Sequence, residues 1–184
     1  GNHETRGNMA REYARYVPKS SGKYYGAYRV GDIMFIVFDC GEDKPDDFWV
    51  YAGLTDFDGY RTEQAAWFGE LIRSKAYKSA KWRIVMNHFP PLSHMESDNP
   101  ERHGIQDITD KFLPLYNQAK IDLMISGHTH AYEFMSPDKY DRLTFPVIVN
   151  STESVARIDI DGRTLKAKVT DTGGNTLKEF TISK

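Results

Sequence analysis

The sequence predicts a mixed α/β (α+β) domain with helices beside its strands and an antiparallel meander at its end. Two patterns indicate this class: apolar strands alternate with helical segments at first, and from Phe145 onward apolar residues recur with a period of two. With 184 residues, 40% of them hydrophobic, the chain can bury a sizeable core. We assign residues 1–150 to the main part of the domain and 151–184 to antiparallel strands that complete it.

The first part of the chain predicts a short helix and a hairpin. Residues 9–16 have helical spacing, and residues 24–30 and 33–39 are rich in the aromatic and β-branched side chains that favour strands. The link Gly31-Asp32 suits a tight turn, because glycine accepts the positive φ that such turns need. The mostly polar stretch 41–60 is interpreted as a long loop, a kind of segment that is often functional in a compact domain.

The middle of the chain predicts two helices and two strands. A helix is expected over 62–75, where apolar residues recur every three or four positions behind a threonine that can cap it. The same spacing predicts a helix over 105–119, with a break or a fresh start at Pro114. Two apolar strands, 82–87 and 121–126, each lead into a histidine motif.

The last part predicts the meander. Ala156, Ile158 and Ile160 alternate with polar residues, so one face of this strand is apolar. Asp161-Gly162 is a strong hairpin signal, and a second turn is expected over 171–175.

Composition excludes several classes of protein. A formal net charge of −2 and a pI near 6.3 offer no electrostatic footprint for nucleic acid. No apolar run approaches the roughly 20 residues of a membrane helix. The single cysteine, Cys40, excludes an internal disulfide framework and a cysteine-rich zinc site, and we interpret it as a small buried residue.

Four of the six histidines stand where strands end or loops begin: His3, His88, His128 and His130. Loops at the carboxyl ends of strands are where α/β folds gather their sites. In extended geometry the side chains of His128 and His130 would point the same way, because they are two residues apart. Imidazole is a good ligand for transition metals, and Asn2 can add a neutral oxygen. The pattern therefore indicates a metal-ligand cluster.

Three motifs follow one another in a specific order. Gly-Asn-His-Glu occupies residues 1–4, Asn-His-Phe-Pro occupies 87–90 and Ser-Gly-His-Thr-His occupies 126–130. In this order they resemble the third, fourth and fifth motifs of the calcineurin-like metallophosphoesterases, and most of all the purple acid phosphatase-type branch. The likeness extends over residues 1–134. It implies part of a metallophosphoesterase β-sandwich flanked by helices, with residues 1–150 as the C-terminal part of the catalytic domain.

The resemblance also implies roles for individual residues. Asn2, His88 and His128 match positions that bind one of two adjacent metal ions, and His130 matches a ligand of the other. His3 matches the residue that faces the substrate phosphate, with Glu4 expected to orient it. In the family, two divalent or trivalent ions of iron, zinc or manganese acidify a water and stabilise an in-line displacement on a phosphate ester.

The sequence departs from the family pattern in one respect. The family's first two motifs, Asp-x-His and Gly-Asp-x-x-Asp, supply the bridging carboxylate and are not found here. We therefore expect an N-terminally truncated fragment of a metal-dependent phosphoesterase, whose set of two ions is incomplete or absent. The alternative is a catalytically silent or degenerate domain that binds at most one metal and acts through association.

Further expectations concern substrate and partners. His94, Arg102 and His103 lie on the loop after the second motif, where related enzymes place substrate-contacting groups, with a solvated loop as the alternative. The expected partner is a small phosphate ester, and neither nucleic acid nor a membrane. A second copy of the chain is expected to cover the sheet edge that truncation exposes. By analogy with the branch, the parent enzyme is expected outside the cytoplasm.

Overall fold

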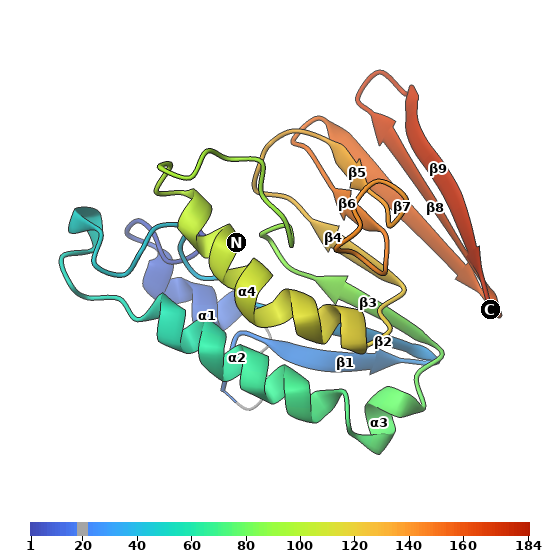
Figure 1. Cartoon of the computed structure of the whole chain (residues 1–184), viewed down its shortest axis with the longest axis horizontal. Coiled ribbons are helices and arrows are strands. Elements are labelled where there is room, and N and C mark those ends of the chain that lie inside the picture. Colours follow the sequence, from blue (N-terminus) through green and yellow to red (C-terminus); the bar gives the residue numbers. More distant parts are fainter. Residues whose placement is uncertain (18–21) are drawn as a thin grey trace.

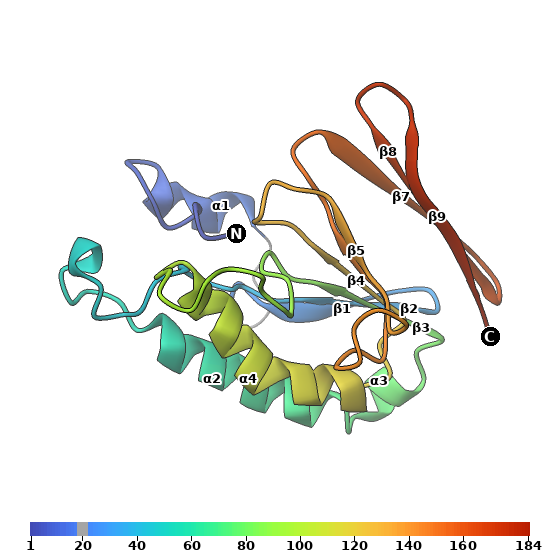
Figure 2. The ribbon, with the colours of Figure 1, turned by 45° about the horizontal axis from the view of Figure 1, so that its top comes forward.

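The computed structural model describes residues 1–17 and 22–184, which form three layers. A six-stranded sheet lies in the middle, with helices α2 (Phe57–Leu71) and α4 (Arg102–Gln118) along one face (Figure 1). A three-stranded sheet packs against the opposite face. The short helices η1 (Ala10–Glu12) and α1 (Tyr13–Tyr16) lie on the side away from α2 and α4 (Figure 2). The predicted mixed α/β class is confirmed.

The six-stranded sheet is mixed. Its order is β1-β2-β3-β4-β6-β5, in which β2, β3, β4 and β6 are parallel neighbours while β1 and β5 pair antiparallel at the two edges. The strands have these bounds: β1 Gly26–Val30, β2 Ile33–Val37, β3 Trp82–Met86, β4 Leu123–Ser126, β5 Glu133–Met135 and β6 Val147–Val149. α2 and the short α3 (Lys75–Lys78) join β2 to β3, and α4 joins β3 to β4.

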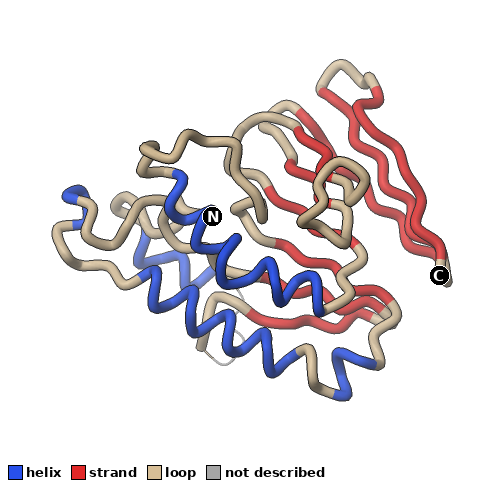
Figure 3. Tube along the Cα trace, viewed as in Figure 1, coloured by secondary structure: helices blue, strands red, loops and turns tan. Residues whose placement is uncertain are grey.

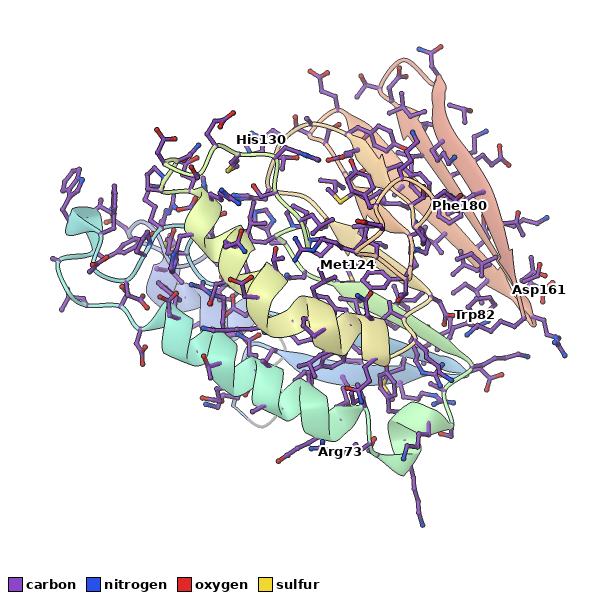
Figure 4. All side chains as sticks on the ribbon, in the orientation of Figure 1. Arg73, Trp82, Met124, His130, Asp161 and Phe180 are labelled. Carbon is purple, nitrogen blue, oxygen red and sulfur yellow. The ribbon has the colours of Figure 1, made fainter. Side chains whose placement is uncertain are left out.

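The parallel arrangement decides where the site lies. Because β2, β3, β4 and β6 run in one direction, their carboxyl ends meet at a single edge of the sheet. The loops gather at this end of the molecule (Figure 3). His130 follows one of these strands and lies far from Trp82 and Asp161, which mark the opposite end (Figure 4). Three of the predicted histidines follow β3 and β4 directly.

Two apolar clusters hold the layers together. One lies between the sheet and the helices, where Phe38, Phe68, Phe112 and Tyr116 pack ring against ring. The other lies between the two sheets and includes Trp82, whose indole Nε1 donates a hydrogen bond to the carbonyl of Gly162 at 3.1 Å. The three-stranded sheet is thereby attached to the main sheet by burial of both inner faces.

The meander is confirmed for residues 154–183. β7 (Ser154–Asp161), β8 (Thr164–Asp171) and β9 (Thr176–Ser183) pair antiparallel in sequence order. β6 does not belong to it, although the period-two pattern begins before it. Its three residues are buried and pair with β4 and β5 in the central sheet.

Both long helices differ from their predicted bounds. α2 begins at Phe57 instead of Thr62, because Asp56 caps it and the carboxylate of Asp46 accepts hydrogen bonds from the N–H groups of Phe57 and Asp58 at 2.8 and 2.9 Å. The predicted loop 41–60 is shorter by the same turn and contains a 3₁₀ turn, η2 (Trp49–Tyr51).

α4 begins at Arg102 and runs through Pro114 without the predicted break. Pro114 and Asp110 are both exposed. The carbonyl of Asp110, which loses its helical partner at a proline, can therefore bond to water, while the buried residues on the other face keep the helix on the sheet. No helix among residues 1–17 and 22–184 is long and apolar enough to cross a membrane.

Candidate active site

The first residues of the chain lie against the carboxyl ends of β3 and β4 and enclose a pocket of about 360 Å³ with them. The pocket brings together most of the predicted site residues, from three distant parts of the sequence. Its lining consists of Gly1, Asn2, His3, Glu4, Arg6, Asp43, His88, Glu101, His128 and His130.

Asn2 is the buried centre of this pocket, with 3% of its surface exposed. Its Nδ2 donates a hydrogen bond to the Asp43 carboxylate at 2.9 Å, and its Oδ1 lies 3.1 Å from Nε2 of His88. A carboxylate can only accept, so Asp43 requires the nitrogen on its own side and leaves the amide oxygen facing His88. The amide oxygen in turn requires the proton of His88 on Nε2.

Arg61 of α2 holds the backbone of the segment that leads into Asp43. Arg61 is fully buried, and its Nη1 donates to the carbonyls of Cys40 and Glu42 at 2.8 and 3.0 Å. Its other nitrogens pair with the carboxylates of Asp58 and Asp107. A buried guanidinium thus supports the backbone immediately before Asp43.

His3 lies on the open side of the pocket, next to Arg6. Nη1 of Arg6 is 3.3 Å from Nε2 of His3, and the rest of the guanidinium pairs with the buried carboxylate of Glu42. Because a guanidinium only donates, the contact requires a lone pair on Nε2 of His3. Glu4, which we expected to orient His3, pairs with the N-terminal ammonium of Gly1 at 2.7 Å.

His88 and His128 face each other as neutral rings. The pKa of His88 is lowered to about 4, mainly by burial and to a smaller degree by the nearby N-terminal ammonium and His128. Burial also lowers the pKa of His128, although Asp43 opposes the shift. The two ring centroids lie 5.2 Å apart. Neutral imidazole is the form that binds a metal ion.

The backbone of the His-x-His motif is turned, whereas the sequence analysis considered it in extended geometry. His128 and His130 have φ values of 72° and 58°, which lie in the left-handed region that non-glycine residues avoid. Each such residue costs roughly 1–2 kcal/mol of backbone strain. Strain of this kind clusters at functional sites, and here it accompanies two side chains that line one pocket.

The donor set fits part of a metal centre. Asn2 Oδ1 and the imidazoles of His88 and His128 are neutral oxygen and nitrogen donors of the kind that zinc, iron or manganese accept. Two of these donors, Asn2 Oδ1 and His88 Nε2, are hydrogen-bonded to each other, with 3.1 Å between the two atoms. However, in the described part of the chain no group of three or more His, Cys, Asp or Glu side chains could hold an ion. These residues fit one ion incompletely and do not by themselves fit two.

The three candidate substrate residues lie outside the lining of this pocket. His94 pairs with Glu133 at 3.0 Å and lies near Tyr140, and His103 pairs with Asp58 at 2.8 Å. Arg102 donates to Gln106 in the first turns of α4. Their role in substrate binding stays a prediction. Cys40 is buried as predicted, and burial raises the pKa of its thiol to about 12.

Sequence reasoning missed the residues that support the site: Arg6, Glu42, Asp43 and Arg61. One signal could have found two of them, since Glu42 and Asp43 follow the carboxyl end of β2 just as His88 follows β3. Arg61 carries no such signal, because a lone arginine on a helix is usually solvated.

A mixed sheet between helices and a second sheet, with histidines and an amide at the carboxyl ends of its parallel strands, defines a domain of the metal-dependent phosphoesterase class. The chain belongs to the calcineurin-like phosphoesterase family, whose sequence model matches residues 1–132. Within that family it falls in the purple acid phosphatase-type branch.

Several relatives support this assignment. The chain is 29% identical to probable purple acid phosphatase 20 of Arabidopsis thaliana over 99 residues, which are 52% of this chain and 22% of the plant protein. It is 32% identical to an uncharacterised protein of Mycobacterium tuberculosis over 76 residues, 41% of this chain and 14% of that protein. The structure of purple acid phosphatase PPD1 from yellow lupin seeds shares the fold, with a TM-score of 0.59 and 15% identity over 90% of this chain and 34% of that one. The chain thus matches a minor part of each relative's length.

Proposed function

We propose that this chain carries the histidine-bearing part of a phosphoesterase site and that the protein hydrolyses small phosphate esters with the help of metal ions. The observation that carries the proposal is the convergence of Asn2, His3, His88, His128 and His130 on one pocket. Ions bound there would polarise a phosphate oxygen and acidify a water molecule. Iron, zinc or manganese suits the donors present.

The chain's own residues have separate tasks in this proposal. Asn2, His88 and His128 hold one ion, and His130 contributes to a second. His3 and Arg6 lie together on the open side of the pocket, 3.3 Å apart, where their nitrogens can face phosphate oxygens. The short distance also allows Arg6 to fix the orientation of the His3 ring, a task that we had expected of Glu4.

A second candidate is a catalytically silent domain that binds at most one ion and acts through association. It is favoured by the absence, among the residues that the structure describes, of three acidic, histidine or cysteine side chains able to hold an ion. By analogy with its purple acid phosphatase relatives, we place the parent protein outside the cytoplasm.

Metal content and turnover separate the two candidates. The protein would be supplemented with zinc, manganese or iron, analysed for bound metal and assayed with 4-nitrophenyl phosphate. The phosphoesterase is supported by two bound ions per chain together with turnover. His128→Ala should abolish this turnover, and the control Arg157→Ala, at an exposed residue, should retain it. At most one ion per chain and no turnover supports the silent domain.

A further inference from the structure

A second cavity, of about 560 Å³, adjoins the active-site pocket. Arg6 lines both, and its guanidinium stands between them, with Nη1 toward His3 and its remaining nitrogens toward Glu42. The cavity is formed by the N-terminal segment and by the loop between β2 and α2, with this lining: Thr5, Arg6, Gly7, Glu42, Lys44, Phe48, Trp49, Val50, Tyr51, Thr55 and Phe57.

Four aromatic rings contribute to this lining. Phe48, Trp49, Tyr51 and Phe57 come from ten consecutive residues, and neighbouring rings lie 6.0–6.4 Å apart. Trp49 has 80% of its surface exposed, although a large aromatic side chain gains most from burial. Exposed apolar surface next to a polar site is typical of a ligand-binding surface.

The loop that carries these rings is built and held at both ends. The N–H of Tyr51 bonds to the carbonyl of Phe48 at 2.9 Å, which closes η2. Asp46 joins the loop to α2, because its carboxylate caps the helix and its carbonyl accepts a hydrogen bond from Thr55 at 3.3 Å. η2, the turn at the left end of Figure 1, supplies residues to the cavity lining from a loop that these hydrogen bonds hold to α2.

The floor of the cavity is polar and satisfied. Glu42 is buried and accepts hydrogen bonds from Arg6, Thr5 and Tyr51. Because the charge of Glu42 is compensated, it does not disfavour an apolar ligand in the cavity. The aromatic rings offer faces on which such a ligand can stack.

We propose that this cavity holds a planar aromatic leaving group of the phosphate ester, with Trp49 stacked on its ring. The inference rests on the proposed function, because it places the phosphate in the pocket of His3 and the rest of the molecule beyond Arg6. Because Arg6 lines both cavities, the phosphate and the ring of one ester would lie on its two sides. The substrates are then aryl phosphates or nucleotides, and sugar phosphates without a ring system bind less tightly.

Four probes test the ring and the phosphate separately: phenyl phosphate, adenosine 5′-monophosphate, adenosine and ribose 5-phosphate. Binding to the metal-supplemented protein is measured by calorimetry and by quenching of tryptophan fluorescence. Quenching reports on Trp49, since Trp82 is fully buried and Trp67 is half-buried. We expect at least one aromatic ester to bind more tightly than ribose 5-phosphate and to quench the emission.

Variants decide whether Trp49 is responsible. Trp49→Ala should weaken binding of the aromatic ester about 5- to 150-fold, the range for loss of one stacking ring, while ribose 5-phosphate binds as before and Trp49→Phe restores most of the affinity. Leu54→Ala is the matched control, because Leu54 is 87% exposed on the same loop and lies outside the cavity lining.

Two results overturn the inference. One is equal affinity for esters with and without a ring, and the other is an aromatic preference that survives Trp49→Ala. Failure of the proposed function looks different, because ribose 5-phosphate would then not bind, whether or not adenosine quenches Trp49.

Discussion

The carboxylate of Asp43 accepts a hydrogen bond from Nδ2 of Asn2 at 2.9 Å, although the two residues are 41 positions apart. This contact decides which atom of the Asn2 amide faces His88. The amide oxygen is the atom that can bind a metal, so under the proposed function Asp43 would orient a ligand without being one of the matched ligands itself.

Removing the charge of Asp43 should therefore weaken metal binding. In Asp43→Asn the new side chain can donate as well as accept, and the Asn2 amide is no longer restricted to one orientation. We expect metal affinity to fall about 10- to 100-fold, as for other residues that orient a ligand. Calorimetric titration with zinc measures it, and Asp47→Asn, on an exposed residue of the same loop, is the control. Unchanged zinc affinity in Asp43→Asn would refute the orienting role.

Replacement of Arg61 should be among the most destabilising changes in the chain. Arg61→Ala leaves the carboxylates of Asp58 and Asp107 and the carbonyls of Cys40 and Glu42 without their shared donor. We expect a loss of about 3–5 kcal/mol in the free energy of unfolding, the usual effect of breaking a buried pair. Urea denaturation measures this, with the exposed Arg73→Ala as the reference. Equal stability of the two variants would show that Arg61 is not a support of the loop.

Acidification should destabilise the metal-free protein through His88. Burial holds its folded pKa near 4, below the ordinary value of 6.5, so between these two values the unfolded chain binds more protons than the folded one. The contribution of neutral His88 is complete above pH 6.5 and is lost as the pH falls toward 4. NMR titration of the His88 ring measures the pKa directly. A value at or above that of a free histidine contradicts the burial that we describe.

Pro114 should be replaceable with a gain in stability. The residue is exposed within α4, and Pro114→Ala restores an N–H that can bond to the carbonyl of Asp110. We expect the free energy of unfolding to rise by about 1–3 kcal/mol, since proline is the least favourable residue inside a helix. Thermal and urea denaturation test this, with Pro137→Ala in an exposed loop for comparison. Destabilisation by Pro114→Ala would indicate that the helix depends on the proline.

Self-association should accompany the exposed apolar surface of the central sheet. Met86, at the end of β3, has 43% of its surface exposed, and Val30 is exposed on the edge strand β1. A second copy of the chain could pair with the unpaired backbone groups of β1, and its apolar side chains could pack on the sheet face that carries Met86. Light scattering should show dimers or larger species that Met86→Gln reduces. A monomer at high protein concentration would argue against association.

Much of the fold could be predicted because it depends on local patterns. The alternation at Ala156, Ile158 and Ile160 reflects which face of a strand is buried, and it specified the meander. The carboxyl ends of parallel strands were recognised from apolar runs that lead into His88 and His128. The same rule predicted a cluster of candidate ligands before any distance was known.

The rest depends on contacts between residues that are distant in sequence. By itself, the sequence determined the class of fold, the antiparallel meander and most of the residues that gather at the site. Only the tertiary structure decided that Asp43 orients the Asn2 amide and that Arg61 supports the backbone before Asp43. It also decided that His128 takes a left-handed backbone conformation. Hydrophobic periodicity reports burial one element at a time, whereas a hydrogen bond across 41 residues exists only after packing has brought both partners to the same end of the sheet.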